Sequence, residues 1–193
     1  MTRKEIVRTS RFIALVLRHR PQAAGIELDE HGWANVRELI DGVNACGRHR
    51  LDMATLEEIV RTDEKGRYSF DETHSHIRAN QGHSIPVDVG LTEATPPDVL
   101  FHGTAERFCT SIEREGLLPM SRLHVHLSQD VPTAVKVGSR HGKPVVWRVD
   151  ARRMYEDSLC FYLSQNGVWL TERVPPEYLS RVDSADTTKD SGE

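Results

Sequence analysis

The sequence lacks the features that mark a secreted or a membrane protein. It has only three cysteines, Cys46, Cys109 and Cys160, which are odd in number, far apart and without a Cys-x-x-Cys pair. A disulfide framework needs paired cysteines and an oxidising compartment, so this usage favours the reduced cytosol. No apolar run approaches the roughly 18 residues that a membrane-spanning helix needs. We therefore expect a cytoplasmic protein with no membrane partner.

Common nucleotide-binding and nucleophile motifs are also missing. The chain has neither a Walker nor a Rossmann glycine-rich phosphate loop, so a nucleotide must be bound in another way. It has no Gly-x-Ser-x-Gly sequence, and none of its cysteines is flanked by a base, which leaves covalent acyl chemistry with little support. The net charge of −4 gives no general attraction for nucleic acid, so a polyanion must be met by a local basic patch.

The stretch from Met120 to Ser128 is the most informative segment of the second half of the chain. Apolar and polar residues alternate along it with the period of a half-buried strand, so that one face carries His124, His126 and Ser128. Arg122 stands where this strand begins, and a guanidinium there suits a phosphate or a carboxylate. Another apolar run ends in Phe101-His102-Gly103-Thr104. We expect the two segments to be neighbouring strands that line one pocket.

The first half of the chain predicts three helices followed by two short strands. One helix reaches His19 and is stopped by Pro21, and two more begin after the N-cap residues Asn35 and Asp52. A short strand is expected at residues 25–29, and a pair of strands at 67–70 and 77–79. Three helices with a two-stranded wing are the order of a winged-helix module, which binds nucleic acid in many proteins and only other proteins in some.

The proline-containing stretch at residues 86–96 predicts a crossing into a second lobe. That lobe alternates strands and helices: a strand at 99–102, a helix at about 105–115, a strand at 123–127, a short helix at about 131–138, a strand at 144–149, a turn, and strands near 159–163 and 168–172. We expect an α+β fold with lobes at residues 1–90 and 91–182. Residues 183–193 are polar and without large apolar side chains, which predicts a disordered tail.

Histidines and arginines are the remaining candidates for chemistry. The pairs His124-x-His126 and His74-x-His76 could chelate a metal, but no third ligand stands near in sequence, so we expect no metal. Arg18, Arg67 and Arg122 each lie where an apolar element starts or ends. Any one of them can be a structural residue, and the basic side of the first helix can be a plain solvated face. If the two lobes face one another, the three guanidinium groups together can hold a phosphate dianion.

Several segments resemble the signatures of the RNA 2′-phosphotransferase family, and they occur in the family's order over residues 5 to 182. These segments are Leu17-Arg18-His19, Asp29-Glu30-His31-Gly32-Trp33, Lys65-Gly66-Arg67-Tyr68, Arg78-Ala79-Asn80-Gln81-Gly82-His83-Ser84, Leu100-Phe101-His102-Gly103-Thr104, Met120 to Ser128, and Gly167-Val168-Trp169-Leu170-Thr171. A single short match would carry little weight, whereas this many over most of the chain make the resemblance specific.

The resemblance implies a winged-helix RNA-binding lobe and an ADP-ribosyltransferase-like lobe of mixed β structure that binds NAD⁺. It implies removal of an internal RNA 2′-phosphate, such as that left at a tRNA splice junction, in two steps. The 2′-phosphate attacks C1″ of the nicotinamide ribose and expels nicotinamide, which leaves an ADP-ribosylated RNA 2′-phosphate. The ribose 2″-OH then attacks phosphorus, which yields RNA with a 2′-OH and ADP-ribose 1″,2″-cyclic phosphate. No metal is needed.

The same resemblance implies the site residues. Its catalytic residues fall on Arg18, His19, Arg67 and Arg122, and its NAD⁺-binding histidine falls on His102. The other expected NAD⁺-binding residues are Gly82, His83, Gly103, Thr104, Ser121, His126 and Ser128. Where many ADP-ribosyltransferases have a glutamate on a late strand, Val168 stands here, which suits an acceptor that is already anionic.

Two other functions stay open on the sequence. One is an ADP-ribosyltransferase that leaves the modification on a nucleic-acid end or a protein. The other is a non-catalytic winged-helix RNA-binding protein, against which the presence of His102, Arg122 and Ser128 counts. We expect a monomer, and an RNA that carries an internal 2′-phosphate as the partner.

Overall fold

The computed structural model describes residues 2–140 and 142–182. The chain divides into two compact units between Leu91 and Thr92, and each is described by itself below. The fold mixes helices with small antiparallel sheets, which confirms the broad α and β content expected from the sequence. The tail predicted at residues 183–193 lies outside the described residues.

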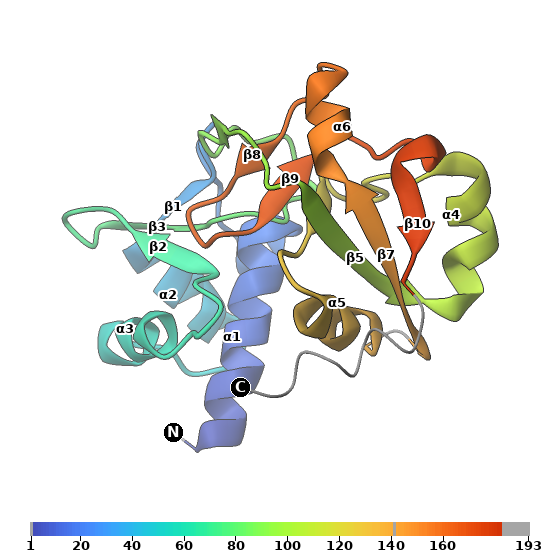
Figure 1. The fold of residues 1–193 in the computed structure, drawn as a ribbon. Helices are drawn as coiled ribbons and strands as arrows, with labels where there is room; N and C mark the ends of the chain where they lie inside the picture. The colour runs from blue at the N-terminus through green and yellow to red at the C-terminus, as the bar shows by residue number, and fades with distance from the viewer. Residues whose placement is uncertain (1, 141, 183–193) are drawn as a thin grey trace, which may run out of the picture. The chain divides into compact units, whose positions relative to one another are not determined.

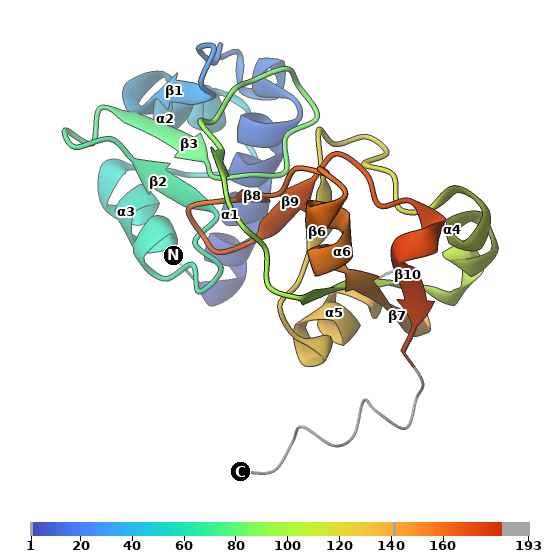
Figure 2. The same ribbon diagram turned by 45° about the horizontal axis from the view of Figure 1, so that its top comes forward.

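The first unit holds three helices and one small sheet (Figures 1 and 2). Its elements are α1 (Arg3–Arg18), a short 3₁₀ helix (Pro21–Ala24), β1 (Trp33–Asn35), α2 (Val36–Ala45), α3 (Met53–Arg61), β2 (Tyr68–Phe70) and β3 (His76–Ala79). β3 is the central strand and pairs antiparallel with both β1 and β2, so that Ile77 lies opposite Ala34 on one side and Phe70 on the other. The predicted order of three helices before a two-stranded hairpin is found, with β1 as an added strand.

Local sequence signals fix the helix ends of this unit. Thr2 and Glu5 form a capping box at the start of α1. The side chain of Asn35 accepts hydrogen bonds from the first turn of α2, and that of Asp52 does the same for α3, so both predicted N-caps are confirmed. The apolar faces of the three helices and the inner face of the sheet form one core, whose fully buried members include Leu17, Leu39, Leu56 and Ile77.

The strand predicted at residues 25–29 is wrong. Gly25 instead ends the 3₁₀ helix with a left-handed φ of 65°, which interrupts an extended segment. The chain then turns at Asp29, whose carboxylate accepts from the backbone N–H groups of His31 and Trp33 at 2.9 and 2.8 Å. The strand of this region is β1, which starts only after that turn.

The second unit holds two antiparallel sheets and three helices within residues 92–140 and 142–182 (Figures 1 and 2). Its strands are β4 (Thr92–Glu93), β5 (Val99–Ala105), β6 (Val125–Leu127), β7 (Pro144–Asp150), β8 (Tyr162–Leu163), β9 (Trp169–Thr171) and β10 (Leu179–Arg181). The helices are α4 (Cys109–Glu115), α5 (Val131–Gly138) and α6 (Ala151–Glu156), with 3₁₀ turns at Glu106–Phe108 and Pro176–Tyr178. One sheet has the order β10-β7-β5 and the other β4-β8-β9-β6.

The helix α5 packs against β5 and β7 at van der Waals distance. A Cβ added to Gly103 of β5 would lie 1.7 Å from the carbonyl oxygen of Ala134, and one added to Gly138 would lie 2.6 Å from that of Thr104. Only glycine at these two positions permits the approach of the helix to the strand. The core of this unit includes Leu100, Phe161 and Trp169.

The sequence did not predict β4, which lies in the expected crossing, the 3₁₀ turn at Pro176–Tyr178, α6 or β10. Residues 151–156 form the helix α6 where the sequence predicted only a turn, and the carboxylate of Asp150 caps it by accepting from the N–H of Arg153. The chain also continues past Pro175-Pro176 into β10, which adds an edge strand to β7.

Candidate functional site

Arg18 and His19 end α1, and a later segment of the same unit holds both. The backbone N–H of Ser84 donates to the carbonyl of Arg18 at 3.0 Å. The hydroxyl of Ser84 lies 2.9 Å from Nδ1 of His19. Arg18 and His19 are thus both contacted by Ser84, which lies 65 positions after His19.

Arg67 directly precedes β2, and a buried carboxylate holds its side chain. Asp63, whose side chain is only 6% exposed, accepts from the backbone N–H of Arg67 at 2.6 Å and also forms an ion pair with its guanidinium. The carbonyl of Arg67 accepts from the backbone N–H of Asn80 at 2.9 Å. A guanidinium that already faces one carboxylate is held in place and keeps further donors for a second anion.

His83 is the most deeply buried histidine of the predicted site, with 3% exposure. Burial lowers its pKa to about 4, and the nearby cations Arg18, His19 and Arg78 act in the same direction. Its Nε2 is buried and lacks a hydrogen-bond partner among the described residues. At neutral pH His83 is thus an uncharged ring behind the cationic end of α1. Its neighbour Gly82 is buried with a left-handed φ of 88°.

In the second unit, His102 and the segment 126–128 lie side by side, as expected, although β5 and β6 belong to different sheets and meet through an isolated bridge. Phe101 and Ser128 exchange two backbone hydrogen bonds of 2.8 and 2.7 Å. Nδ1 of His102 lies 3.1 Å from the carbonyl oxygen of His126, so it is the N–H that donates. Burial lowers the pKa of His102, and Arg122 lowers it further, whereas the bond to His126 opposes the shift. The ring is accordingly held neutral.

Arg122 lies in the turn before β6, next to Ser121 and within the field of a second cation. Both Ser121 and Arg122 are exposed. Burial of part of the Arg122 side chain lowers its pKa, and the charge of Arg140 adds to the effect. Two cations crowded in this way gain from a bound anion. Gly103 and Thr104, the other predicted residues of β5, are buried against α5, where glycine is required by packing alone.

The two histidine pairs are not part of a metal site among the residues that the structure describes. Within the described ranges no group of three or more His, Cys, Asp or Glu side chains is arranged to hold a metal ion. The ring of His124 packs edge-on against Tyr162 with centroids 5.7 Å apart, and His74 and His76 face Glu57 and Asp71 respectively. No helix in the described part of the chain is both long and apolar enough to cross a bilayer.

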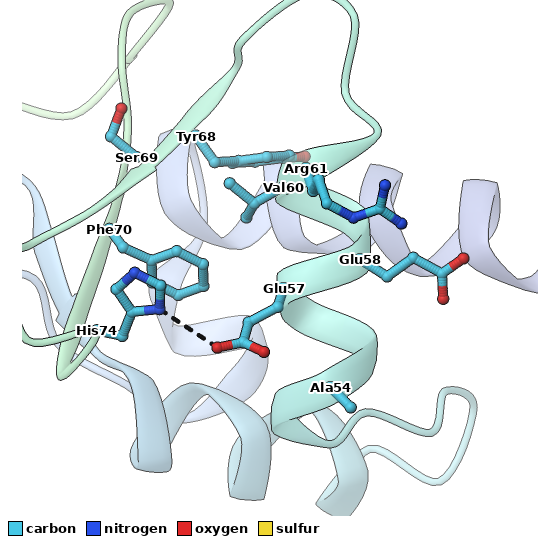
Figure 3. A pocket seen from close by; sticks show the side chains of 9 residues that line it. All are labelled: Ala54, Glu57, Glu58, Val60, Arg61, Tyr68, Ser69, Phe70 and His74. Carbon is cyan, nitrogen blue, oxygen red and sulfur yellow. Dashed lines mark hydrogen bonds and ion pairs between the residues drawn. The ribbon is translucent and has the colours of Figure 1, made fainter.

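A cavity of about 810 Å³ lies between α3 and the wing (Figure 3). The nine lining residues are Ala54, Glu57, Glu58, Val60, Arg61, Tyr68, Ser69, Phe70 and His74. The ring of His74 stacks on Phe70 with centroids 4.5 Å apart and contacts Glu57. Two glutamates make this pocket a poor receptor for phosphate, and its lining contains none of the predicted site residues.

Comparison with known proteins identifies the family of the chain. The profile of the "RNA 2'-phosphotransferase, Tpt1 / KptA family" matches residues 4–173, which includes the segments that hold Arg18, Arg67, His102 and Arg122. The chain belongs to the RNA 2′-phosphotransferase family.

Relatives in this RNA 2′-phosphotransferase family are similar along nearly their whole length. A protein of Flavobacterium johnsoniae is 51% identical over 170 residues, which cover 88% of this chain and 93% of the relative. A protein of Nostoc punctiforme is 48% identical over 184 residues, which cover 94% of this chain and 100% of the relative. A protein of Agrobacterium fabrum is 51% identical over 172 residues, which cover 89% of this chain and 92% of the relative. Each is named "Probable RNA 2'-phosphotransferase".

The site holds residues that the sequence did not single out. Asp63 forms an ion pair with Arg67, and the hydroxyl of Ser84 contacts the ring of His19. The charge of Arg140 lowers the pKa of Arg122. Asp63 stands four residues before Arg67, a spacing at which an ion pair can be suspected. Ser84 stands in one of the segments that resemble the family, but nothing in the sequence pairs it with His19, and nothing local in the sequence signals Arg140.

Proposed function

We propose that this protein uses NAD⁺ to remove an internal 2′-phosphate from RNA, such as the phosphate left at a tRNA splice junction. Membership of the family makes it an RNA 2′-phosphotransferase, a transferase. The proposal adds the co-substrate and the residues that act. The observation that carries it is the family match, which spans residues 4–173 and so includes every proposed site residue.

The residues around His102 fit NAD⁺. The nicotinamide ring of NAD⁺ carries a positive charge, so a neutral histidine is a better neighbour for it than an imidazolium. His102 meets this need because burial and Arg122 lower its pKa. His102 orients the nicotinamide ribose, with Ser121, His126 and Ser128 as further polar groups and with Gly103 and Thr104 forming the strand. Gly82 and His83 complete the proposed binding residues.

When bound, NAD⁺ supplies the ribose carbon that the RNA 2′-phosphate attacks and finally carries the phosphate away as ADP-ribose 1″,2″-cyclic phosphate. Arg18, Arg67 and Arg122 hold the phosphate oxygens throughout. Their guanidinium groups stay protonated, so they neutralise the added negative charge at phosphorus without a proton transfer. His19 donates a hydrogen bond to the phosphate or relays a proton. Holding the anion against the sugar supplies much of the remaining rate.

The first unit is proposed as a winged-helix module that binds the RNA, and the second as an ADP-ribosyltransferase-like unit. The order α1, β1, α2, α3 and the β2–β3 hairpin supports the first assignment. Two small antiparallel sheets with His102 on β5 are compatible with the second. The cysteine usage supports action in the cytoplasm, and we propose a monomer.

The test is Arg122→Ala, assayed with NAD⁺ and a short RNA that bears one internal 2′-phosphate. The wild-type protein should yield RNA with a 2′-OH together with ADP-ribose 1″,2″-cyclic phosphate, both identified by mass. Arg122→Ala should lose at least about 100-fold in kcat/KM, as expected for a transition-state donor. Arg114→Ala is the matched control, because the side chain of Arg114 is 76% exposed and forms an ion pair with its neighbour Glu115.

Each other outcome points to a different function. A wild-type protein that accumulates ADP-ribosylated RNA without the cyclic phosphate would be an ADP-ribosyltransferase. One that binds the RNA and leaves NAD⁺ intact would be a binding protein. Release of the 2′-phosphate by Arg122→Ala at the wild-type rate would remove Arg122 from the mechanism.

A further inference from the structure

Three of the four proposed phosphate-binding residues lie in the first unit, and one short segment touches all three. The segment is Asn80-Gln81-Gly82-His83-Ser84, which follows β3 and is called the strap below. At its start, the N–H of Asn80 donates to the carbonyl of Arg67 at 2.9 Å. At its end, the N–H of Ser84 donates to the carbonyl of Arg18 at 3.0 Å, and its hydroxyl lies 2.9 Å from Nδ1 of His19.

Further contacts make the strap rigid at the wing end. The side-chain amide of Asn80, which is 6% exposed, donates to the carbonyl of Gly66 at 2.7 Å, so two bonds tie Asn80 to the residues that begin β2. The ring of His83 is 3% exposed and faces Gly32. Gly82 adopts a φ of 88°, which a side chain would strain. The strap therefore has one defined path between Arg67 and the end of α1.

The hydroxyl of Ser84 has a particular chemical consequence for His19. An imidazole has two ring nitrogens, and the partner of one decides the orientation and the proton of the other. With Nδ1 directed at Ser84, Nε2 is the nitrogen on the opposite side of the ring. For a neutral ring, a serine hydroxyl that donates to Nδ1 leaves the proton on Nε2; for a charged ring the hydroxyl accepts. Both of these arrangements present an N–H at Nε2, the donor that a phosphate dianion requires. A neutral ring that donates from Nδ1 to the Ser84 oxygen would instead leave Nε2 without a proton, and a bound dianion favours the first two arrangements because it can only accept.

We infer that the strap is a positioning element for the phosphate-binding residues, and that Ser84 orients His19 so that Nε2–H points at the RNA 2′-phosphate. Ser84 itself touches neither substrate. This inference rests on the proposed function, since it assigns a role toward the phosphate that His19 binds.

The test compares Ser84→Ala with Ser84→Thr in the full-length protein. Ser84 is exposed, so either change is tolerated by the fold. Loss of one hydrogen bond should lower kcat/KM for 2′-phosphorylated RNA by roughly 3- to 10-fold, and threonine should restore it because the hydroxyl is kept. The KM for NAD⁺ should not change. Ser75→Ala, an exposed serine in the turn between β2 and β3, is the matched control and should keep wild-type activity.

Two readouts separate orientation of His19 from a general structural role. In Ser84→Ala the ¹⁵N chemical shifts of the His19 ring should move toward those of the other tautomer or an even mixture. In a double-mutant cycle for binding of the 2′-phosphorylated RNA, Ser84→Ala should have no effect in a His19→Ala background. Wild-type binding and unchanged His19 signals in Ser84→Ala would overturn the inference, and so would equal effects of Ser84→Ala in both backgrounds.

Failure of the inference is distinguishable from failure of the proposed function. If the wild-type protein does not release the 2′-phosphate, the function is wrong. If the wild-type protein is active and the Ser84 variants behave like it, only the positioning role is wrong.

Discussion

The buried histidine behind α1 should make the stability of the first unit depend on pH. His83 has a pKa of about 4 in the folded protein, compared with an ordinary value of 6.5. In the unfolded chain it takes up a proton as the pH falls through 6.5, whereas the folded protein resists until about 4. Between these values the unfolded state binds more protons, so the free energy of unfolding decreases as the pH falls.

The size of this effect follows from the two pKa values. Complete titration over 6.5 to 4 corresponds to about 3 kcal/mol, at roughly 1.4 kcal/mol for each pKa unit. At pH 5 the unfolded chain is almost fully protonated at this residue and the folded one is not, so about 2 kcal/mol of stability should be lost relative to pH 7.5. The folded protein has its full stability with respect to the titration of His83 only above pH 6.5.

The assay is urea denaturation of wild type and His83→Gln between pH 7.5 and 5. Glutamine is neutral throughout, so the variant should be less stable at pH 7.5 but should lose about 2 kcal/mol less on acidification. His31→Gln is the control, since the side chain of His31 is 52% exposed, and it should follow the wild-type curve. Parallel curves for wild type and His83→Gln would show that His83 titrates normally, and the reasoning from its burial would be refuted.

Two further substitutions test the packing and the ion pair described above. Gly103→Ala places a Cβ 1.7 Å from the carbonyl oxygen of Ala134, so α5 must shift. Thermal denaturation should show that the free energy of unfolding falls by roughly 2–3 kcal/mol. An unchanged melting temperature would mean that α5 does not pack closely against β5. Asp63→Ala removes the buried partner of Arg67. The free energy of unfolding measured in urea should fall by roughly 3 kcal/mol, and the KM for 2′-phosphorylated RNA should rise. Wild-type values of both quantities would mean that Asp63 does not hold the guanidinium of Arg67.

The elements that depend on nearby residues were predictable from the sequence. A cap residue acts on the N–H groups two or three positions later, which is why Asn35 and Asp52 marked α2 and α3 correctly. Proline at position 21 cannot continue α1, which ends at Arg18. In each case the signal and its effect lie within one turn of the chain.

Elements that depend on distant partners were missed or misplaced. β10 exists because it can pair with the edge of β7, at Ser180 opposite Arg148, and nothing near residue 180 announces that partner. α6 has only six residues, too few for an apolar stripe to be recognised. The alternation at residues 25–29 looked like a strand, but no neighbouring strand pairs with it in the described sheet of this unit.

The candidate site shows the same division. Arg18, His19, Arg67, His102 and Arg122 were found because the family resemblance names them. The resemblance also includes Ser84 and Asn80, but their contacts were not predicted, since Ser84 lies 65 residues from His19 and Asn80 meets Gly66 across 14 residues. Sequence reasoning therefore proposes candidate substrate-binding residues more readily than it shows which residues hold them in place.

The alternation at residues 123–128 shows how far a pattern can lead. It correctly predicted that Val125 and Leu127 are buried. Leu123, in contrast, is 40% exposed, because β6 begins only at Val125, after a turn in which Met120 has a φ of 57°. It also grouped the histidines as equal members of one polar face. In the structure His126 holds the ring of His102 through its backbone carbonyl, which accepts from that ring. A substitution that changes the side chain of His126 keeps that carbonyl, so the orientation of His102 should survive His126→Ala, a distinction that side-chain periodicity cannot make.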